Sequence, residues 1–262
     1  MKIALMDSGI GLLAAAAALR ELRPDADLVL SSDPDGMPWG PRTPEDVTAH
    51  ALAVARAAAA EGPDALIVAC NTASVHALEA IRAELEPEIP VVGTVPAIKP
   101  AAAGGGSVAI WATPATTGSP YQSGLIDEFG GAAEIVEVAC PGLADAVDRA
   151  DQPAVSRAVA DAASRTPERV RALVLGCTHY ELVADQIRAA VGAGPVFFGS
   201  AGAVAAQAVR RVAAGARERQ GGGRLLVLRS GRVEPLPPEA LRYPAGRAIA
   251  AEDSVVAARV RH

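Results

Sequence analysis

Ala65-Leu66-Ile67-Val68-Ala69-Cys70-Asn71-Thr72 has a close counterpart in Ala172-Leu173-Val174-Leu175-Gly176-Cys177-Thr178-His179. In each segment, an apolar run typical of a buried strand ends at a cysteine, and small polar residues follow at once. We interpret the two segments as copies of one strand, each copy carrying a thiol at the same end.

A second pair of similar segments lies upstream of these strands. Ile3-Ala4-Leu5-Met6-Asp7-Ser8-Gly9 is matched by Val108-Ala109-Ile110-Trp111-Ala112-Thr113-Pro114. The distance to the cysteine is also similar, 62 residues from Ser8 and 64 residues from Thr113. A half-domain duplicated in this way would place two thiols opposite each other across a cleft. Such a pair suits a reaction in which a proton leaves one face of a carbon while another arrives on the opposite face, and racemisation is a reaction of this kind.

Composition and charge exclude several classes of protein. The chain has 262 residues, of which 50% are hydrophobic and only 3% aromatic, so alanine, valine and leucine must fill the core. That length is enough for one large α/β domain or two small ones. The net charge of −6 lacks the basic footprint of a nucleic-acid-binding protein. We expect no membrane span and no signal peptide, and the three cysteines favour free thiols in a reducing cytoplasm.

Strands alternate with helices along most of the chain, which predicts parallel sheets covered by helices on both faces. We expect a first α/β domain of residues 1–94 plus about 205–262 and a second of residues 95–204. The expected strands are 2–6, 27–31, 65–69, 89–93, 107–111, 134–138, 172–176 and 195–198. The expected helices are 12–22, 44–60, one starting near 74, 120–129, helices within 143–163, and 181–190.

The C-terminal part gives fewer signals. Residues 200–219 are predicted to form a helix that packs on the first domain. Gly221-Gly222-Gly223 is predicted to be a flexible joint, and 225–228 a short strand. Residues 232–262 contain no motif that we can interpret. The sequence allows a homodimer but does not require one.

Removing the α-proton of an amino acid without a cofactor requires two bases in opposite protonation states. A pyridoxal enzyme would use a lysine, but only Lys2 and Lys99 are present, and neither lies in a convincing cofactor motif. A thiolate is a suitable base because neighbouring groups can tune its pKa. Asp7 is the candidate for tuning Cys70, and His179 for tuning Cys177. We expect no metal and no nucleotide, since Gly104-Gly105-Gly106 lacks a phosphate-binding arrangement.

Five motifs in succession resemble those of the glutamate racemases, a family within the aspartate/glutamate racemase superfamily. They occur in the family's order and span residues 3 to about 204. The motifs are Asp7-Ser8-Gly9-Ile10-Gly11, Pro38-Trp39-Gly40-Pro41, Ala69-Cys70-Asn71-Thr72-Ala73-Ser74, Ala112-Thr113-Pro114-Ala115-Thr116 and Gly176-Cys177-Thr178-His179-Tyr180.

The resemblance implies two pseudo-symmetric α/β domains with the active site between them. It implies that Cys70 deprotonates the D-enantiomer and Cys177 the L-enantiomer of glutamate, with Asp7 beside the first thiol and His179 assisting the second. The product would supply D-glutamate for bacterial cell-wall peptidoglycan. The remaining substrate-binding residues implied by the motifs are Ser8, Pro38, Trp39, Gly40, Asn71, Thr72, Thr113, Thr116 and Thr178.

Several positions depart from the family pattern and bear on the substrate. Trp39 stands where tyrosine is usual, and Leu12 where a further glycine is usual. The segment Thr117-Gly118-Ser119-Pro120-Tyr121 lacks the customary lysine. Asp148 takes the place of a glutamate that supports the histidine. These departures leave open a related racemase or isomerase with another acidic substrate, such as an aspartate racemase or a maleate isomerase.

Some residues are expected to have only a structural role. Cys140 is predicted to be a small core residue, since buried free cysteines are common. His50 and His76 fall on predicted helices and are interpreted as solvated or packing residues.

A binding protein on a decayed racemase scaffold is a third hypothesis, but decay would be expected to remove one of the two thiols first.

Overall fold

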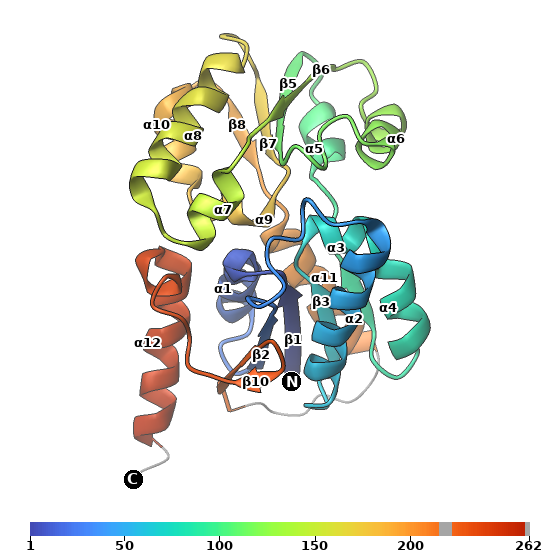
Figure 1. The fold of residues 1–262 in the computed structure, drawn as a ribbon, viewed down its shortest axis with the longest axis vertical. Coiled ribbons are helices and arrows are strands. Elements are labelled where there is room, and N and C mark those ends of the chain that lie inside the picture. The colour runs from blue at the N-terminus through green and yellow to red at the C-terminus, as the bar shows by residue number, and fades with distance from the viewer. Residues whose placement is uncertain (215–221, 260–262) are drawn as a thin grey trace. The chain divides into compact units, whose positions relative to one another are not determined.

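The computed structural model describes residues 1–214 and 222–259 of the chain. Contacts divide the described part into two compact units (Figure 1). Unit 1 comprises Met1–Thr94 together with the described part of Ala201–His262, and unit 2 comprises Val95–Ser200.

Unit 1 is built on a six-stranded sheet with the order β10-β9-β2-β1-β3-β4. Every neighbouring pair is parallel except β10 and β9, which are antiparallel. The short edge strand β10 follows β9 through a tight turn. The strands are β1 (Lys2–Asp7), β2 (Asp27–Ser32), β3 (Ala65–Val68), β4 (Val91–Gly93), β9 (Leu225–Arg229) and β10 (Arg232–Val233).

Helices cover both faces of this sheet, as the buried strands require. Ala4 and Met6 of β1 pack with one face of α2 (Pro44–Ala59) in a single apolar cluster. Ile3 and Leu5 are equally buried and point to the opposite face, because side chains alternate along a strand. The other helices of this unit are η1 (Ile10–Leu12), α1 (Leu13–Leu22), α3 (Asn71–His76), α4 (Leu78–Leu85), α11 (Ala201–Ala214), η2 (Ala240–Arg242) and α12 (Pro244–Arg259), with α11 lying against β3, β4 and α1.

Unit 2 is built on a four-stranded parallel sheet with the order β6-β5-β7-β8. Its apolar cluster joins β5 and β7 to α5 and α6. The strands are β5 (Ser107–Ala112), β6 (Glu134–Ala139), β7 (Ala172–Leu175) and β8 (Val196–Phe198). The helices are α5 (Ile98–Ala102), α6 (Pro120–Phe129), α7 (Leu143–Asp148), α8 (Gln152–Arg165), α9 (Thr178–Glu181) and α10 (Ala184–Val191).

The two sheets repeat one topology. The order β2-β1-β3-β4 in unit 1 matches β6-β5-β7-β8 in unit 2. The register is the same as well, since Ala69 N donates to Met6 O and Gly176 N donates to Trp111 O, each at 2.8 Å. The expected fold class, α/β with two parallel-sheet units of matching design, is confirmed.

The helices after the two cysteines differ from those predicted. The first was predicted to start near 74, but α3 begins at Asn71, immediately after Cys70. The helix predicted at 181–190 corresponds to α10, and the short helix α9, which begins at Thr178 immediately after Cys177, was not predicted. Small polar residues obscured these starts because they are also typical of loops. The capping prediction at the start of α2 is confirmed, since the Thr43 side chain accepts a hydrogen bond from Asp46 N.

The C-terminal part is more ordered than the sequence suggested. Gly222 and Gly223 donate backbone hydrogen bonds to Asp27 Oδ1 and Asp25 O, so they form a fixed connection into β9 and not the flexible joint predicted there. Gly221 and the predicted helical residues 215–219 lie outside the described residues. Among the helices that the structure describes, none is long and apolar enough to cross a membrane.

Candidate active site

Both thiols occupy the same local position in their units. Cys70 follows β3 and is the N-cap of α3, with φ −144° and ψ 121°. Cys177 follows β7 and is the N-cap of α9, with φ −140° and ψ 136°. Each side chain is nearly buried, with exposed fractions of 5% and 8%. The repeat seen in the sequence therefore extends to the backbone geometry of the two cysteines.

Asp7 and Ser8, at the end of β1, surround the Cys70 thiol. The Asp7 carboxylate is fully buried and accepts hydrogen bonds from Ser8 N at 2.6 Å and from Ser8 Oγ at 3.2 Å. Burial and the negative charge of Asp7 raise the pKa of Cys70 well above its ordinary value, although backbone N–H groups of Ala73 and Ser8 oppose this shift. Cys70 is therefore a neutral thiol at neutral pH, next to a carboxylate that can accept its proton.

A histidine and a carboxylate are aligned behind Cys177. Cys177 Sγ lies 4.0 Å from His179 Nδ1, and His179 Nε2 lies 3.1 Å from Asp148 Oδ1 at the end of α7. A carboxylate that accepts the Nε2–H leaves Nδ1 to face the sulfur, where it can take or return a proton. Asp148 thus occupies the supporting position that the sequence departure suggested for it.

Close backbone packing fixes the position of Cys177. A Cβ atom at Gly176 would lie 2.7 Å from Trp111 O and 3.3 Å from the Ala112 side chain. Any larger residue would push the β7 end away from β5.

At the end of β5, Thr113 Oγ1 and Thr116 Oγ1 lie 3.2 Å apart, so these two expected substrate ligands form one hydroxyl pair.

The loop that carries Pro38, Trp39 and Gly40 is organised around Asp33. Trp39 is almost fully buried and donates from its indole nitrogen to Asp33 Oδ2 at 3.1 Å. Its indole nitrogen is thus engaged inside unit 1, whereas Pro38 is exposed and Gly40 is half-buried.

The other expected substrate ligands follow the two thiols directly in sequence. Asn71 and Thr178 are buried at the first positions of α3 and α9, and Thr72 is half-buried in α3. Unit 1 therefore brings together Asp7, Ser8, Cys70, Asn71 and Thr72. The corresponding end of the unit 2 sheet carries Cys177, Thr178, His179 and the threonine pair.

Neither Asp33 nor His50 was predicted to be a site residue. Asp33 follows β2 at the same sheet end as Asp7 and is 6% exposed, and its backbone N donates to Ser8 O. His50, expected to be a solvated or packing residue, places Nδ1 2.7 Å from Asp33 Oδ2. A carboxylate directly after a predicted strand was the available signal for Asp33. Nothing local marks His50 as its partner.

Comparison with known proteins identifies the family of this chain. A model of the Asp/Glu/Hydantoin racemase family matches residues 12–209. A glutamate racemase of Roseiflexus sp. is 37% identical over 78% of this chain and 76% of its own. The chain belongs to the Asp/Glu/Hydantoin racemase family.

Solved structures show the same fold in this family. The glutamate racemase of Thermus thermophilus, solved in complex with β-chloro-D-alanine, has 29% identity and a TM-score of 0.70, covering 96% of this chain and 93% of its own. The Escherichia coli glutamate racemase superimposes with a TM-score of 0.78 over 98% of this chain and 94% of its own, at 24% identity. The fold of this family member is thus shared over almost its whole length.

The third thiol of this family member has a different setting. Cys140 is 1% exposed, its Sγ lies 3.4 Å from Val138 O, and its carbonyl accepts a hydrogen bond from Tyr180. Burial raises the pKa of Cys140 from 9.0 to about 12. These contacts describe a packed core thiol.

Replacing Cys140 by alanine is expected to remove one alkaline transition from the stability of the protein. Below pH 9 the thiol is neutral in the folded and unfolded chain, so its contribution is fully present. From 9 to about 12 the unfolded chain ionises first, and the contribution is lost at up to about 1.4 kcal/mol per pH unit. Urea unfolding at several alkaline pH values should give a shallower fall for Cys140→Ala than for wild type. Equal slopes would show that the thiol ionises freely in the folded state.

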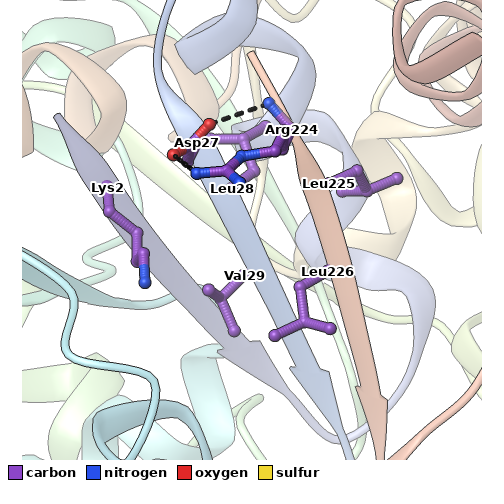
Figure 2. A pocket seen from close by; sticks show the side chains of 7 residues that line it. All are labelled: Lys2, Asp27, Leu28, Val29, Arg224, Leu225 and Leu226. Atoms are coloured by element: carbon purple, nitrogen blue, oxygen red, sulfur yellow. Dashed lines mark hydrogen bonds and ion pairs between the residues drawn. The ribbon is translucent and has the colours of Figure 1, made fainter. Parts of the chain in front are cut away.

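One cavity of unit 1 lies at the amino ends of the strands, away from Asp7 and Cys70. It has a volume of about 250 Å³ and begins at Lys2, Asp27 and Leu225, the first residues of β1, β2 and β9 (Figure 2). Figure 2 shows Arg224 hydrogen-bonded to Asp27, and Val29 and Leu226 also line the cavity. Asp7 and Cys70 lie at the opposite, carboxyl ends of the strands, where ligands of parallel sheets bind.

Proposed function

We propose that this chain is a glutamate racemase that works without a cofactor and uses Cys70 and Cys177 as its two bases. The observation that carries the proposal is the equivalent placement of one nearly buried thiol after the third strand of each unit. In this proposal each thiol acts on one face of the α-carbon of the substrate, and each lies at the carboxyl end of its own sheet. The glutamate racemases of Roseiflexus sp. and Thermus thermophilus support glutamate as the substrate.

The environment of Cys70 suits one half of the reaction. A two-base racemase needs one thiol and one thiolate at a time, because one group donates a proton while the other accepts one. Burial and Asp7 keep Cys70 protonated, which makes it the donor when the L-enantiomer is bound. When the D-enantiomer is bound, Asp7 can hold the thiol proton, so that Cys70 acts as the base.

The environment of Cys177 suits the other half of the reaction, removal of the α-proton from the L-enantiomer. His179, oriented by Asp148, can accept the proton of Cys177 and stabilise the thiolate that attacks the α-proton of L-glutamate. The group that accepts the thiol proton therefore differs between the two cysteines: it is the Asp7 carboxylate for Cys70 and the His179 imidazole for Cys177.

The remaining polar groups are proposed to bind the substrate carboxylates. Backbone and side-chain donors at Ser8, Asn71, Thr72, Thr113 and Thr178 are suitable, with Thr116 supporting Thr113. Pro38, Trp39 and Gly40 are proposed to shape the pocket, with Trp39 acting from a buried position. We propose glutamate, a small amino acid, as the substrate. We further propose that the protein works in the cytoplasm and that the D-glutamate formed is used for peptidoglycan synthesis.

The purified protein is expected to interconvert L- and D-glutamate after dialysis against a chelator and hydroxylamine. L-glutamate, D-glutamate and both aspartates are incubated separately in D₂O, and α-deuterium incorporation and optical rotation are followed. Rotation should fall to zero from either glutamate, with much slower change for aspartate. Racemisation of aspartate alone, or activity that returns only on addition of pyridoxal phosphate or a metal, would contradict the proposal.

A further inference from the structure

The turn between β9 and β10 contains a residue in an unfavourable backbone conformation. Ser230 has φ +45° and Gly231 has φ +77°, so both central residues of this two-residue hairpin turn are left-handed. Glycine, asparagine and aspartate are the residues usually found at such positions, and a serine there is uncommon. Strained residues of this kind often have a functional reason.

The Ser230 hydroxyl is hydrogen-bonded to two residues of the loop that follows β2. It donates to Asp33 Oδ1 at 3.1 Å and accepts a hydrogen bond from Asp35 N at 3.2 Å. The backbone N of Ser230 donates to Ser32 O at 2.7 Å. Arg232 adds an ion pair with Asp35, but both side chains are more than half exposed, so that pair contributes little. The hydroxyl is therefore the main side-chain link from the hairpin to this loop.

Asp33 transmits this link to Trp39. One carboxylate oxygen accepts from Ser230 Oγ and Gly36 N, and the other from Trp39 Nε1 and lies beside His50 Nδ1. The cluster has no spare room, since a Cβ atom at Gly36 would lie 2.0 Å from Asp33 Oδ2. Removing the Ser230 donor leaves Oδ1 with the Gly36 N–H, which weakens the restraint on the carboxylate that accepts the indole N–H.

We propose that Ser230 is a positioning residue that holds Asp33, and through it the Pro38-Trp39-Gly40 loop, in the geometry needed for the reaction. Ser230 lies outside residues 12–209, which the family model matches. The C-terminal hairpin of this chain thus contributes to the site without touching the substrate. Its effect on turnover rests on the proposed function, but its effect on the indole of Trp39 does not.

The substitution Ser230→Gly separates the hydroxyl from the backbone. Glycine accepts a left-handed conformation at no steric cost, so the turn should be retained, and relief of the strain at this position offsets part of the stability lost with the hydroxyl. The indole N–H exchange rates are measured by ¹H–¹⁵N NMR, with the Trp39 signal assigned from its absence in Trp39→Phe. Trp111, which donates to Thr166 in unit 2, is an internal reference. We expect exchange at Trp39 to accelerate about tenfold, as for one lost hydrogen bond to a charged group, and exchange at Trp111 to be unchanged.

Kinetics and a matched variant complete the test. Ser230→Gly is expected to lower kcat/KM for glutamate about tenfold while lowering the thermal midpoint by no more than about a few degrees. The control Arg224→Ala breaks the ion pair with Asp27 at the other end of the same hairpin and should change neither exchange nor kcat/KM. Unchanged Trp39 exchange in Ser230→Gly would overturn the proposal, whether or not glutamate is the substrate. Faster Trp39 exchange with unchanged kcat/KM would also overturn it, since the loop would then be held for no catalytic purpose. If exchange is faster but the wild-type protein racemises no amino acid, the coupling between Ser230 and Trp39 is confirmed. The proposed function is then rejected.

Discussion

Replacing either Cys70 or Cys177 by serine is expected to lower the rate of glutamate racemisation by about 10³-fold or more. A serine hydroxyl is far less acidic than a thiol, so it can neither supply nor remove the α-proton at a useful rate, and general acid–base catalysis is worth about 10²–10⁴-fold. The measurement is kcat in both directions for each variant. Cys140→Ser makes the same chemical change at a packed core thiol to which the proposal gives no role in the reaction, and it should stay within about a few-fold of wild type.

The two cysteine variants should also fail in opposite ways. Elimination from a glutamate that carries a leaving group on its β-carbon needs only the base that removes the α-proton. Cys70→Ser should therefore retain elimination from the L-form and lose it from the D-form, and Cys177→Ser should do the reverse. Loss of the same enantiomer in both variants, or wild-type racemisation by either, would contradict the assignment of the two thiols.

Asp7→Asn is expected to lower racemisation by about 10²–10³-fold while making Cys70 more reactive. The carboxylate is the group placed to accept the thiol proton, and its charge, after burial, raises the pKa of Cys70. Removing the charge brings that pKa back toward its ordinary value, so more thiolate exists at pH 8. Iodoacetamide labelling, followed by peptide mass spectrometry, should be faster at Cys70 in the variant.

The control for this substitution is Asp27→Asn at the first residue of β2. It changes a carboxylate of the same kind at the opposite end of the sheet and should affect neither activity nor Cys70 labelling. Thermal midpoints of both variants show whether faster labelling reflects unfolding. Slower labelling of Cys70 in Asp7→Asn would mean that Asp7 acts as the base that creates the thiolate in the free protein.

Much of the fold follows from local patterns in the sequence. The apolar runs ending at Asp7, Cys70 and Cys177 predicted buried parallel strands, and the structure has strands there in matching order and register. The segment Pro120–Phe129 is helical over the predicted range, since Ser119 caps it and proline occupies its first position. These signals are contained in a few consecutive residues, which is why they can be read without a structure.

The polar clusters around the site depend on contacts that no local pattern encodes. Asp33 and His50 are 17 residues apart, and Asp33 and Ser230 are 197 apart, yet each pair is within hydrogen-bonding distance. The pairing of β9 with β2 brings the last pair together, and the strand predicted at 225–228 carried no signal for the strand it would pair with. The helix start at Thr178 was also not predicted, because a hydroxyl residue after a strand is equally typical of a turn.

The most direct test of the two-thiol proposal is the fate of the α-proton of L-glutamate in D₂O at low conversion. Cys177 would remove the proton from one face, and Cys70, already exchanged with solvent, would deliver deuterium to the other. We therefore predict that the D-glutamate formed carries deuterium at its α-carbon from the first turnovers, while the remaining L-glutamate still carries protium. Protium retained in the D-glutamate, or deuterium appearing equally in both enantiomers, would contradict a mechanism with one thiol on each face.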